Sequence, residues 1–155
     1  HTAVSYDKNA NQWEATNNYH KEKWNIESTL GYFGGYNYEV AKDGTVKQFR
    51  EDGEETVAQY QQDMNDGRAI SICLDGNFDD ELPTDQQKQK VAELILEKMN
   101  TFQIEEKNVV THRSLADYKS CPGKLLPDDI YHYFILMNDK ENPSNILPWA
   151  KEACD

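Results

Sequence analysis

The stretch AISICLDGNFDDELPTDQQ, residues 69–87, combines the two patterns that decide the fold of this 155-residue chain. Its first part, residues 69–74, is a run of strand-forming residues that is apolar on nearly both faces, which is typical of a central strand. Its last part places Thr84 and Gln87 in the T-x-x-Q spacing of a helix capping box, directly after Pro83. A buried strand followed by a capped helix predicts an α/β fold.

Three segments have the spacing of amphipathic helices. The first covers residues 10–26, the second follows the capping box, and the third covers residues 128–137. Each is expected to bury one face against a sheet or its loops. The residues expected on these faces are Trp13, Asn17, His20 and Trp24 in the first helix, Val91, Leu94, Ile95, Met99 and Phe102 in the second, and Ile130, Phe134 and Met137 in the third.

Short strands are expected between these helices. Residues 36–41 alternate in polarity, residues 45–49 form the return strand, and Asp43-Gly44 between them is a strong two-residue hairpin signal. The residues expected on one face of the first strand are Tyr36, Tyr38 and Val40. The remaining segments are a Gly-rich loop over residues 30–35, a weak helix or loop over 54–65, a short strand over 109–111 and a loop over 112–123.

The balance of charges limits the partners of this chain. Lys and Arg together number 16 and Asp and Glu together number 28, which gives a formal net charge of −12. This charge argues against DNA, RNA and anionic lipid as partners, because phosphate groups are bound by local positive charge. No apolar run is long enough to cross a membrane. We therefore expect no nucleic-acid partner, no membrane partner and a monomeric protein.

The length corresponds to about one domain. Residues 138–155 become polar and contain Pro143 and Pro148, which is typical of a surface tail or linker. We therefore expect one domain over residues 1–137 and a tail over residues 138–155. The three cysteines are an odd number, which does not suit a disulfide framework.

His112 and Cys121 are candidate metal ligands. The histidine follows a predicted strand, and the cysteine comes nine residues later in a loop that ends Cys-Pro-Gly. Imidazole and thiolate are ligands that Zn²⁺ accepts, although a site needs a third ligand with water in the fourth position. The alternative is a buried cysteine beside a hydrogen-bonded surface histidine.

Two other side chains could support chemistry at such a site. Lys119, two residues before Cys121, could stabilise a developing oxyanion, or it could be an ordinary solvated lysine. Tyr36 opens a strand after two glycines, and its alternative is cross-strand aromatic packing. His20 lies between two tryptophans and is expected to be a core or pocket-wall residue. His132 is expected to be solvated, and Cys73 to be a small buried hydrophobe.

Taken in order, these segments resemble the zinc-dependent N-acetylmuramoyl-L-alanine amidases of the phage-lysozyme and peptidoglycan-recognition-protein type. The resemblance runs from residue 1 to about residue 133, and five motifs in the family's order make it specific. They are HTAVS at residues 1–5, YHKEKW at 19–24, GGYNYEVAKDGTVKQFRE at 34–51, AISICLDGNFDDELPTDQQ at 69–87, and VVTHRS with KSCPGKLL in the last loop. The resemblance implies a mixed central β-sheet flanked by helices, with zinc in a surface groove.

The resemblance also implies roles for individual residues. His112 and Cys121 match the second and third zinc ligands of the family. Tyr36 matches its hairpin tyrosine that assists catalysis, and Lys119 matches the basic residue two positions before the cysteine ligand. The first ligand of the family is a histidine in the pattern H-x-T/S-A, whereas His1 is followed directly by Thr2. Either a residue ahead of this pattern supplies the ligand or His1 does, and His1 is the candidate that we name.

The function implied is that of a peptidoglycan hydrolase of the endolysin or autolysin kind. It would cleave the amide bond between N-acetylmuramic acid and the L-alanine of the stem peptide, using a zinc-bound water. Tyr36 and Lys119 would stabilise the oxyanion or assist proton transfer. The alternative is a non-catalytic domain that only binds peptidoglycan. The cysteine ligand is typically replaced in such domains, so Cys121 favours the enzyme.

Overall fold

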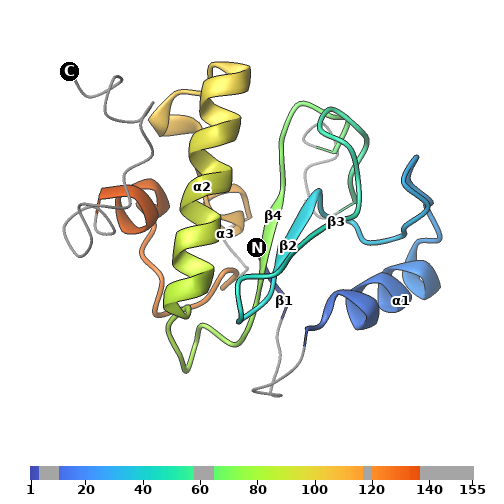
Figure 1. Ribbon diagram of the computed structural model, residues 1–155, viewed down its shortest axis with the longest axis horizontal. Coiled ribbons are helices and arrows are strands. Elements are labelled where there is room, and N and C mark those ends of the chain that lie inside the picture. Colours follow the sequence, from blue (N-terminus) through green and yellow to red (C-terminus); the bar gives the residue numbers. More distant parts are fainter. Residues whose placement is uncertain (4–10, 58–64, 117–119, 137–155) are drawn as a thin grey trace.

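A four-stranded mixed sheet lies at the centre of the computed structural model, which describes residues 1–3, 11–57, 65–116 and 120–136 (Figure 1). The strands are β1 (Thr2–Ala3), β2 (Tyr38–Val40), β3 (Val46–Gln48) and β4 (Ile72–Asp75), in the order β1-β4-β2-β3. Both β1 and β2 run parallel to β4, and β3 runs antiparallel to β2. The mixed sheet with flanking helices confirms the expected fold class.

The helices lie on both sides of this sheet. They are α1 (Trp13–Lys23), α2 (Asp85–Phe102), the 3₁₀-helix η2 (Glu106–Asn108), α3 (His112–Leu115) and the π-helix η3 (His132–Leu136). Figure 1 shows α1 and α2 on opposite sides of the strands, with η3 beside α2. Among the described residues, no helix combines the length and the apolar character needed to span a membrane.

The two faces of the sheet differ in chemistry. Side chains alternate along a strand, so neighbouring residues point to opposite faces. The face toward α2 is apolar: Tyr38, Val40 and Leu74 pack with the buried residues of α2, including Val91 and Ile95. The opposite face, toward α1, carries the polar residues Glu39, Cys73 and Asp75, all with at most 1% of their surface exposed.

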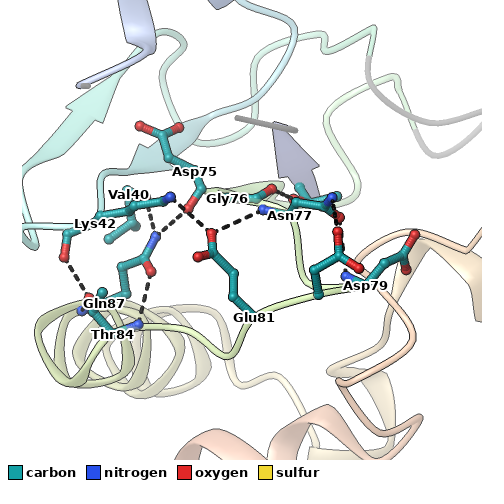
Figure 2. Close-up of polar contacts among 11 residues, drawn as sticks. Val40, Lys42, Asp75, Gly76, Asn77, Asp79, Glu81, Thr84 and Gln87 are labelled. Carbon is teal, nitrogen blue, oxygen red and sulfur yellow. Dashed lines mark hydrogen bonds and ion pairs between the residues drawn. The ribbon is translucent and has the colours of Figure 1, made fainter. Parts of the chain in front are cut away.

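The side chain of Gln87 joins α2 to two strands (Figure 2). Its amide nitrogen donates to the carbonyl oxygens of Val40 at 3.2 Å and Asp75 at 2.8 Å. Its side-chain oxygen accepts from the Thr84 backbone nitrogen at 3.1 Å, and the Thr84 hydroxyl accepts from the Gln87 backbone nitrogen, so the expected capping box is confirmed. Gln87 is 1% exposed, and these contacts hold α2 against the ends of both parallel strands.

Most of the expected elements are confirmed, with shifted bounds. The helix expected over residues 10–26 is α1, and the central strand expected over residues 69–74 is β4, which begins later, at Ile72. The hairpin loop has three residues instead of two, because the Ala41 nitrogen pairs with the Thr45 oxygen. The loop closes with Gly44 at φ +86°, as in a type I turn followed by a left-handed residue.

Several expectations are wrong or only partly met, among them the burial of Trp24, which is 38% exposed at the end of α1. Tyr36 does not share a face with Tyr38, because the chain bends over residues 35–37 before β2 begins. Residues 109–111 form no strand: the sheet consists of β1, β4, β2 and β3, and this segment pairs with none of them. The expected loop after residue 111 begins with the short helix α3, and Phe102 of the expected stripe is half exposed.

Some expectations fall wholly or partly outside the described residues. In the segment 54–65, residues 54–57 are not helical and residues 58–64 are not described. In the last helix, Ile130 and Phe134 are buried and His132 is exposed, as expected, whereas residue 137 lies outside the described part. The tail expected over residues 138–155 also lies outside it, so the domain boundary stays a prediction.

Replacing Gln87 by leucine is expected to lower the free energy of unfolding by roughly 2–4 kcal/mol. The change keeps the side-chain bulk but leaves the buried carbonyl oxygens of Val40 and Asp75 without their amide donor. Urea unfolding of both proteins measures the difference. The matched control is Gln89→Leu on the exposed side of α2, which is expected to change stability by less than about 0.5 kcal/mol. Equal losses in both variants would contradict the bridging role of Gln87.

Candidate functional site

Three residues that are distant in sequence form a cluster of potential metal ligands. His1, His112 and Cys121 each offer one ligand atom, and these atoms all lie within 4.8 Å of one another. The Cys121 sulfur lies 4.0 Å from Nδ1 of His1, and the two imidazole rings are 4.6 Å apart at their centroids. Ligands of one tetrahedral Zn²⁺ lie roughly 3.3–3.7 Å apart, so small side-chain rotations bring these atoms to that spacing. Two imidazoles and a thiolate therefore suit Zn²⁺.

The parallel pairing of β1 with β4 positions His1. Its terminal amino group donates to the carbonyl oxygen of Ile72 at 3.0 Å, and its own carbonyl oxygen accepts from Leu74 at 3.1 Å. The next residue, Thr2, donates its backbone N–H to the sulfur of Cys121 at 3.3 Å.

Arg113, which follows His112 directly, ties the second candidate ligand to the loop of the third. Its backbone nitrogen donates to the carbonyl oxygen of Cys121 at 2.9 Å. Its guanidinium donates to the carbonyl oxygens of Gly123, at 2.7 Å, and Leu126, and pairs with Asp128 at 2.6 Å. This role of Arg113 was not predicted from the sequence, although its place beside a candidate ligand was a signal.

The Cys121 loop also rests on the segment that follows β4. The backbone nitrogen of Leu125 donates to the carbonyl oxygen of Phe78 at 2.9 Å. Gly123 has a φ of +139°, and a Cβ there would lie 2.5 Å from the carbonyl carbon of Phe78. Only glycine allows this approach, so it holds the candidate ligand loop close to the sheet.

Tyr36 lies beside the cluster. Its ring centroid is 5.1 Å from that of His1. Burial raises the pKa of the Tyr36 hydroxyl well above its usual value of 10, and the nearby Cys73 and Cys121 add to this effect. The phenol therefore keeps its proton at neutral pH and can donate a hydrogen bond toward the cluster. Lys119, the other residue expected to assist catalysis, lies outside the described residues.

His20 and Cys73 have the structural surroundings expected of them. His20 is 5% exposed, and its Nδ1 accepts a hydrogen bond from the Gly35 backbone nitrogen at 2.7 Å. Burial lowers its pKa from 6.5 to about 4, with smaller effects from Lys23 and Arg50. Cys73 is fully buried, and burial raises the pKa of its thiol. Among the described residues, neither belongs to the three-ligand cluster.

A buried pair of carboxyl groups, which was not predicted from the sequence, lies on the same face of the sheet. Glu39 of β2 accepts a hydrogen bond from the Thr16 hydroxyl of α1 at 2.8 Å, and Asp75 of β4 accepts one from the Gln12 backbone nitrogen at 3.1 Å. Burial, together with the hydrogen bond to Asp75 and its charge, raises the pKa of Glu39 to about 9. Glu39 therefore keeps its proton at neutral pH. The signal in the sequence that could have predicted this pair was an acidic residue in each of two otherwise apolar strands.

A groove of about 620 Å³ reaches the cluster from the other side of the sheet. His1 and His112 lie in its wall together with residues of β4 and α2. Tyr36 is not part of this wall, so the phenol and the groove reach the candidate ligands from different sides. The apolar side chains of the wall include Ile70, Ile72, Leu74, Ile95, Met99, Phe102, Val109 and Val110.

Comparisons with known proteins agree on one family. The family described as N-acetylmuramoyl-L-alanine amidase matches residues 1–124. Among solved structures, the chain is similar to the N-acetylmuramoyl-L-alanine amidase LysC from Clostridium intestinale URNW, with 25% identity, a TM-score of 0.65, and coverage of 86% of this chain and 79% of that one. The endolysin amidase LysCS from the same organism gives 25% identity, a TM-score of 0.65, and coverage of 86% and 78%.

A peptidoglycan recognition protein shares the fold. PGRP-SA from Apis mellifera is 20% identical, with a TM-score of 0.61 and coverage of 92% of this chain and 79% of that one. Identity at this level supports the likeness of fold alone. No curated protein sequence matches this chain significantly.

The Glu39→Gln variant is expected to flatten the pH dependence of stability. Glu39 has a raised pKa in the folded protein, so it keeps its proton after the unfolded chain has ionised. Its contribution to the free energy of unfolding is therefore fully present below about pH 4.5. This contribution is lost as the pH rises toward about 9, by at most about 1.4 kcal/mol per pH unit. Glutamine keeps the shape and the hydrogen bonds but does not ionise. Urea unfolding at pH 5.5 and 8.5 measures the effect.

The parent protein serves as the control for other titrating groups. The lowered pKa of His20 acts in the opposite direction, because its contribution is lost as the pH falls from 6.5 toward 4. Both proteins share this effect, so the difference between their pH curves isolates Glu39. Parallel curves would show that Glu39 is ionised in the folded protein and would refute its raised pKa.

Proposed function

The chain belongs to the N-acetylmuramoyl-L-alanine amidase family, and we propose that it is a Zn²⁺-dependent peptidoglycan hydrolase. Its substrate would be the amide bond between N-acetylmuramic acid and the L-alanine of the stem peptide. The observation that carries this proposal is the cluster of His1, His112 and Cys121 with the Tyr36 ring beside it. Three ligands leave a coordination position open, as in catalytic zinc sites.

Each residue of the site would have a distinct task. His1, His112 and Cys121 would hold Zn²⁺, which when bound polarises a carbonyl group and acidifies a coordinated water. Tyr36 would donate its phenolic hydrogen bond to the oxygen that gains negative charge as the amide bond is attacked. Lys119 would add a positive charge near that oxygen. A part-buried site strengthens these interactions, because water does not screen them fully.

Binding without catalysis is the second candidate function. The likeness of fold to PGRP-SA favours it, because that protein is a peptidoglycan recognition protein by name. Two observations support hydrolysis over binding alone: all three candidate ligands are present, and the ring of Tyr36 lies beside that of His1. Both functions have peptidoglycan as the partner. We further propose that residues 1–137 act as one monomeric catalytic domain.

The proposed activity is tested by incubating the purified chain, loaded with Zn²⁺, with bacterial cell walls. Hydrolysis of the muramoyl amide bond releases the amino group of L-alanine, which labelling with an amine reagent detects. New L-alanine amino termini without new reducing sugar ends would support the proposal. Walls that are bound but release no amino termini would favour the recognition protein.

The Cys121→Ala variant is expected to lose most of its Zn²⁺. The parent protein, purified without chelator, should contain about one equivalent of zinc, as a single mononuclear site requires. Elemental analysis of the folded proteins measures both. The matched control is Cys73→Ala, which removes a buried thiol outside the cluster and should keep the metal. An unchanged zinc content in Cys121→Ala would refute the ligand assignment.

The Tyr36→Phe variant is expected to keep its fold and zinc but to lose turnover. The change removes only the hydroxyl, whose hydrogen bond would stabilise the transition state by about 3–4 kcal/mol at most. This corresponds to a fall in kcat of roughly 100-fold to 1,000-fold. Steady-state kinetics together with zinc analysis test it. Turnover at the parent rate would remove Tyr36 from the proposed mechanism.

A further inference from the structure

We infer that His20 is a positioning residue for Tyr36, because its Nδ1 holds the backbone that carries the phenol toward the cluster of candidate metal ligands. The inference rests on the proposed function of Tyr36. It concerns a contact between α1 and the loop before β2. Tyr36 lies in a bend outside any strand, so its position depends on the segment of residues 33–35 that precedes it.

Two side chains of α1 bind three consecutive amides of this segment. Oδ1 of Asn17 accepts from the backbone nitrogens of Phe33 at 2.6 Å and Gly34 at 3.1 Å. Nδ1 of His20 accepts from the backbone nitrogen of Gly35 at 2.7 Å. Residues three apart lie on the same face of a helix, so Asn17 and His20 act together from one side of the segment.

The carbonyl oxygens of the same segment are bound from the other side. Arg50 is 1% exposed, and its Nε donates to the carbonyl oxygen of Gly34 at 2.8 Å. Its guanidinium also reaches the carbonyl oxygen of Phe33 at 3.5 Å. The carbonyl oxygen of Gly35 accepts from the Val57 backbone nitrogen at 3.2 Å. Side chains and a single backbone contact thus replace the hydrogen bonds that a strand would supply.

His20 binds the amide directly before Tyr36 and lies beside its ring. Its ring centroid lies 5.4 Å from that of Tyr36 and 4.7 Å from that of Trp24. A Cβ on Gly35 would lie 3.2 Å from Nδ1 of His20 and 2.6 Å from Val57, so the backbone packs closely between them. A shift of the Gly35 amide would therefore move the adjacent phenol.

The protonation state of His20 suits this contact. An Nδ1 that accepts a hydrogen bond carries no proton, so the proton of the neutral ring is on Nε2. The lowered pKa of about 4 keeps the ring neutral at pH 7. Asparagine places its Oδ1 near the position of Nδ1, whereas glutamine places its oxygen nearer to that of Nε2. Both substitutions introduce a polar amide side chain into α1, and they differ in where the accepting oxygen lies. Comparing them therefore tests the position of the hydrogen-bond acceptor.

The experiment compares His20→Asn with His20→Gln in the full chain. We expect His20→Asn to keep kcat within about threefold of the parent and His20→Gln to lose at least tenfold, with KM and zinc content unchanged in both. The control Thr16→Val removes a different hydrogen bond between α1 and the sheet and should leave kcat unchanged. Equal kcat values for the two His20 variants, or a parent-like kcat in His20→Gln, would overturn the inference.

A second readout does not depend on catalysis. In ¹H–¹⁵N NMR spectra, the Gly35 amide should stay protected from hydrogen exchange in His20→Asn and lose protection in His20→Gln. Loss of protection in neither variant would overturn the contact itself. A parent protein without amidase activity would overturn the proposed function and the catalytic part of the inference. The hydrogen-exchange protection of the Gly35 amide would still test whether His20 holds this backbone.

Discussion

The buried side-chain amide of Gln87 connects the start of α2 to the carboxyl ends of β2 and β4. A buried amide is costly unless its polar atoms are paired, so this contact allows one arrangement of the helix and the two strands. The segment after β4 then runs toward Phe78, whose carbonyl oxygen supports the loop that contains Cys121. The placement of one candidate metal ligand therefore follows from the packing of a helix far from it in sequence.

The division of the sheet into an apolar and a polar face follows from the same arrangement. Apolar residues of β2 and β4 meet α2, and burial of this surface provides the main driving force for folding. The opposite face carries the carboxyl pair and lies next to the candidate site. Polar groups there are buried, and hydrogen bonds from α1 compensate for part of the cost. The role of α1 is thus mainly to bind polar groups, in contrast to α2.

Much of the candidate site could be predicted from the sequence, because its residues belong to short local motifs. Tyr36, His112 and Cys121 were named from their neighbours, and the structure brings them together with His1. The residues that hold them in place were not predicted. Arg113 reaches Leu126 and Asp128 across 13 and 15 residues, and Asn17 reaches Phe33 across 16, and neither spacing nor periodicity reveals such contacts.

The sequence by itself determined the class of fold, the order of the main elements and the capped start of α2. Each of these follows from apolar periodicity or from a hydrogen bond between residues three apart. The tertiary structure alone decided that residues 109–111 form no strand and that Tyr36 turns away from the face of Tyr38. A strand forms only where its backbone pairs with another strand, which residues 109–111 do not do, and the bend before β2 is held by side chains of α1 and by Arg50. Both depend on residues distant in sequence, so only the folded chain sets them.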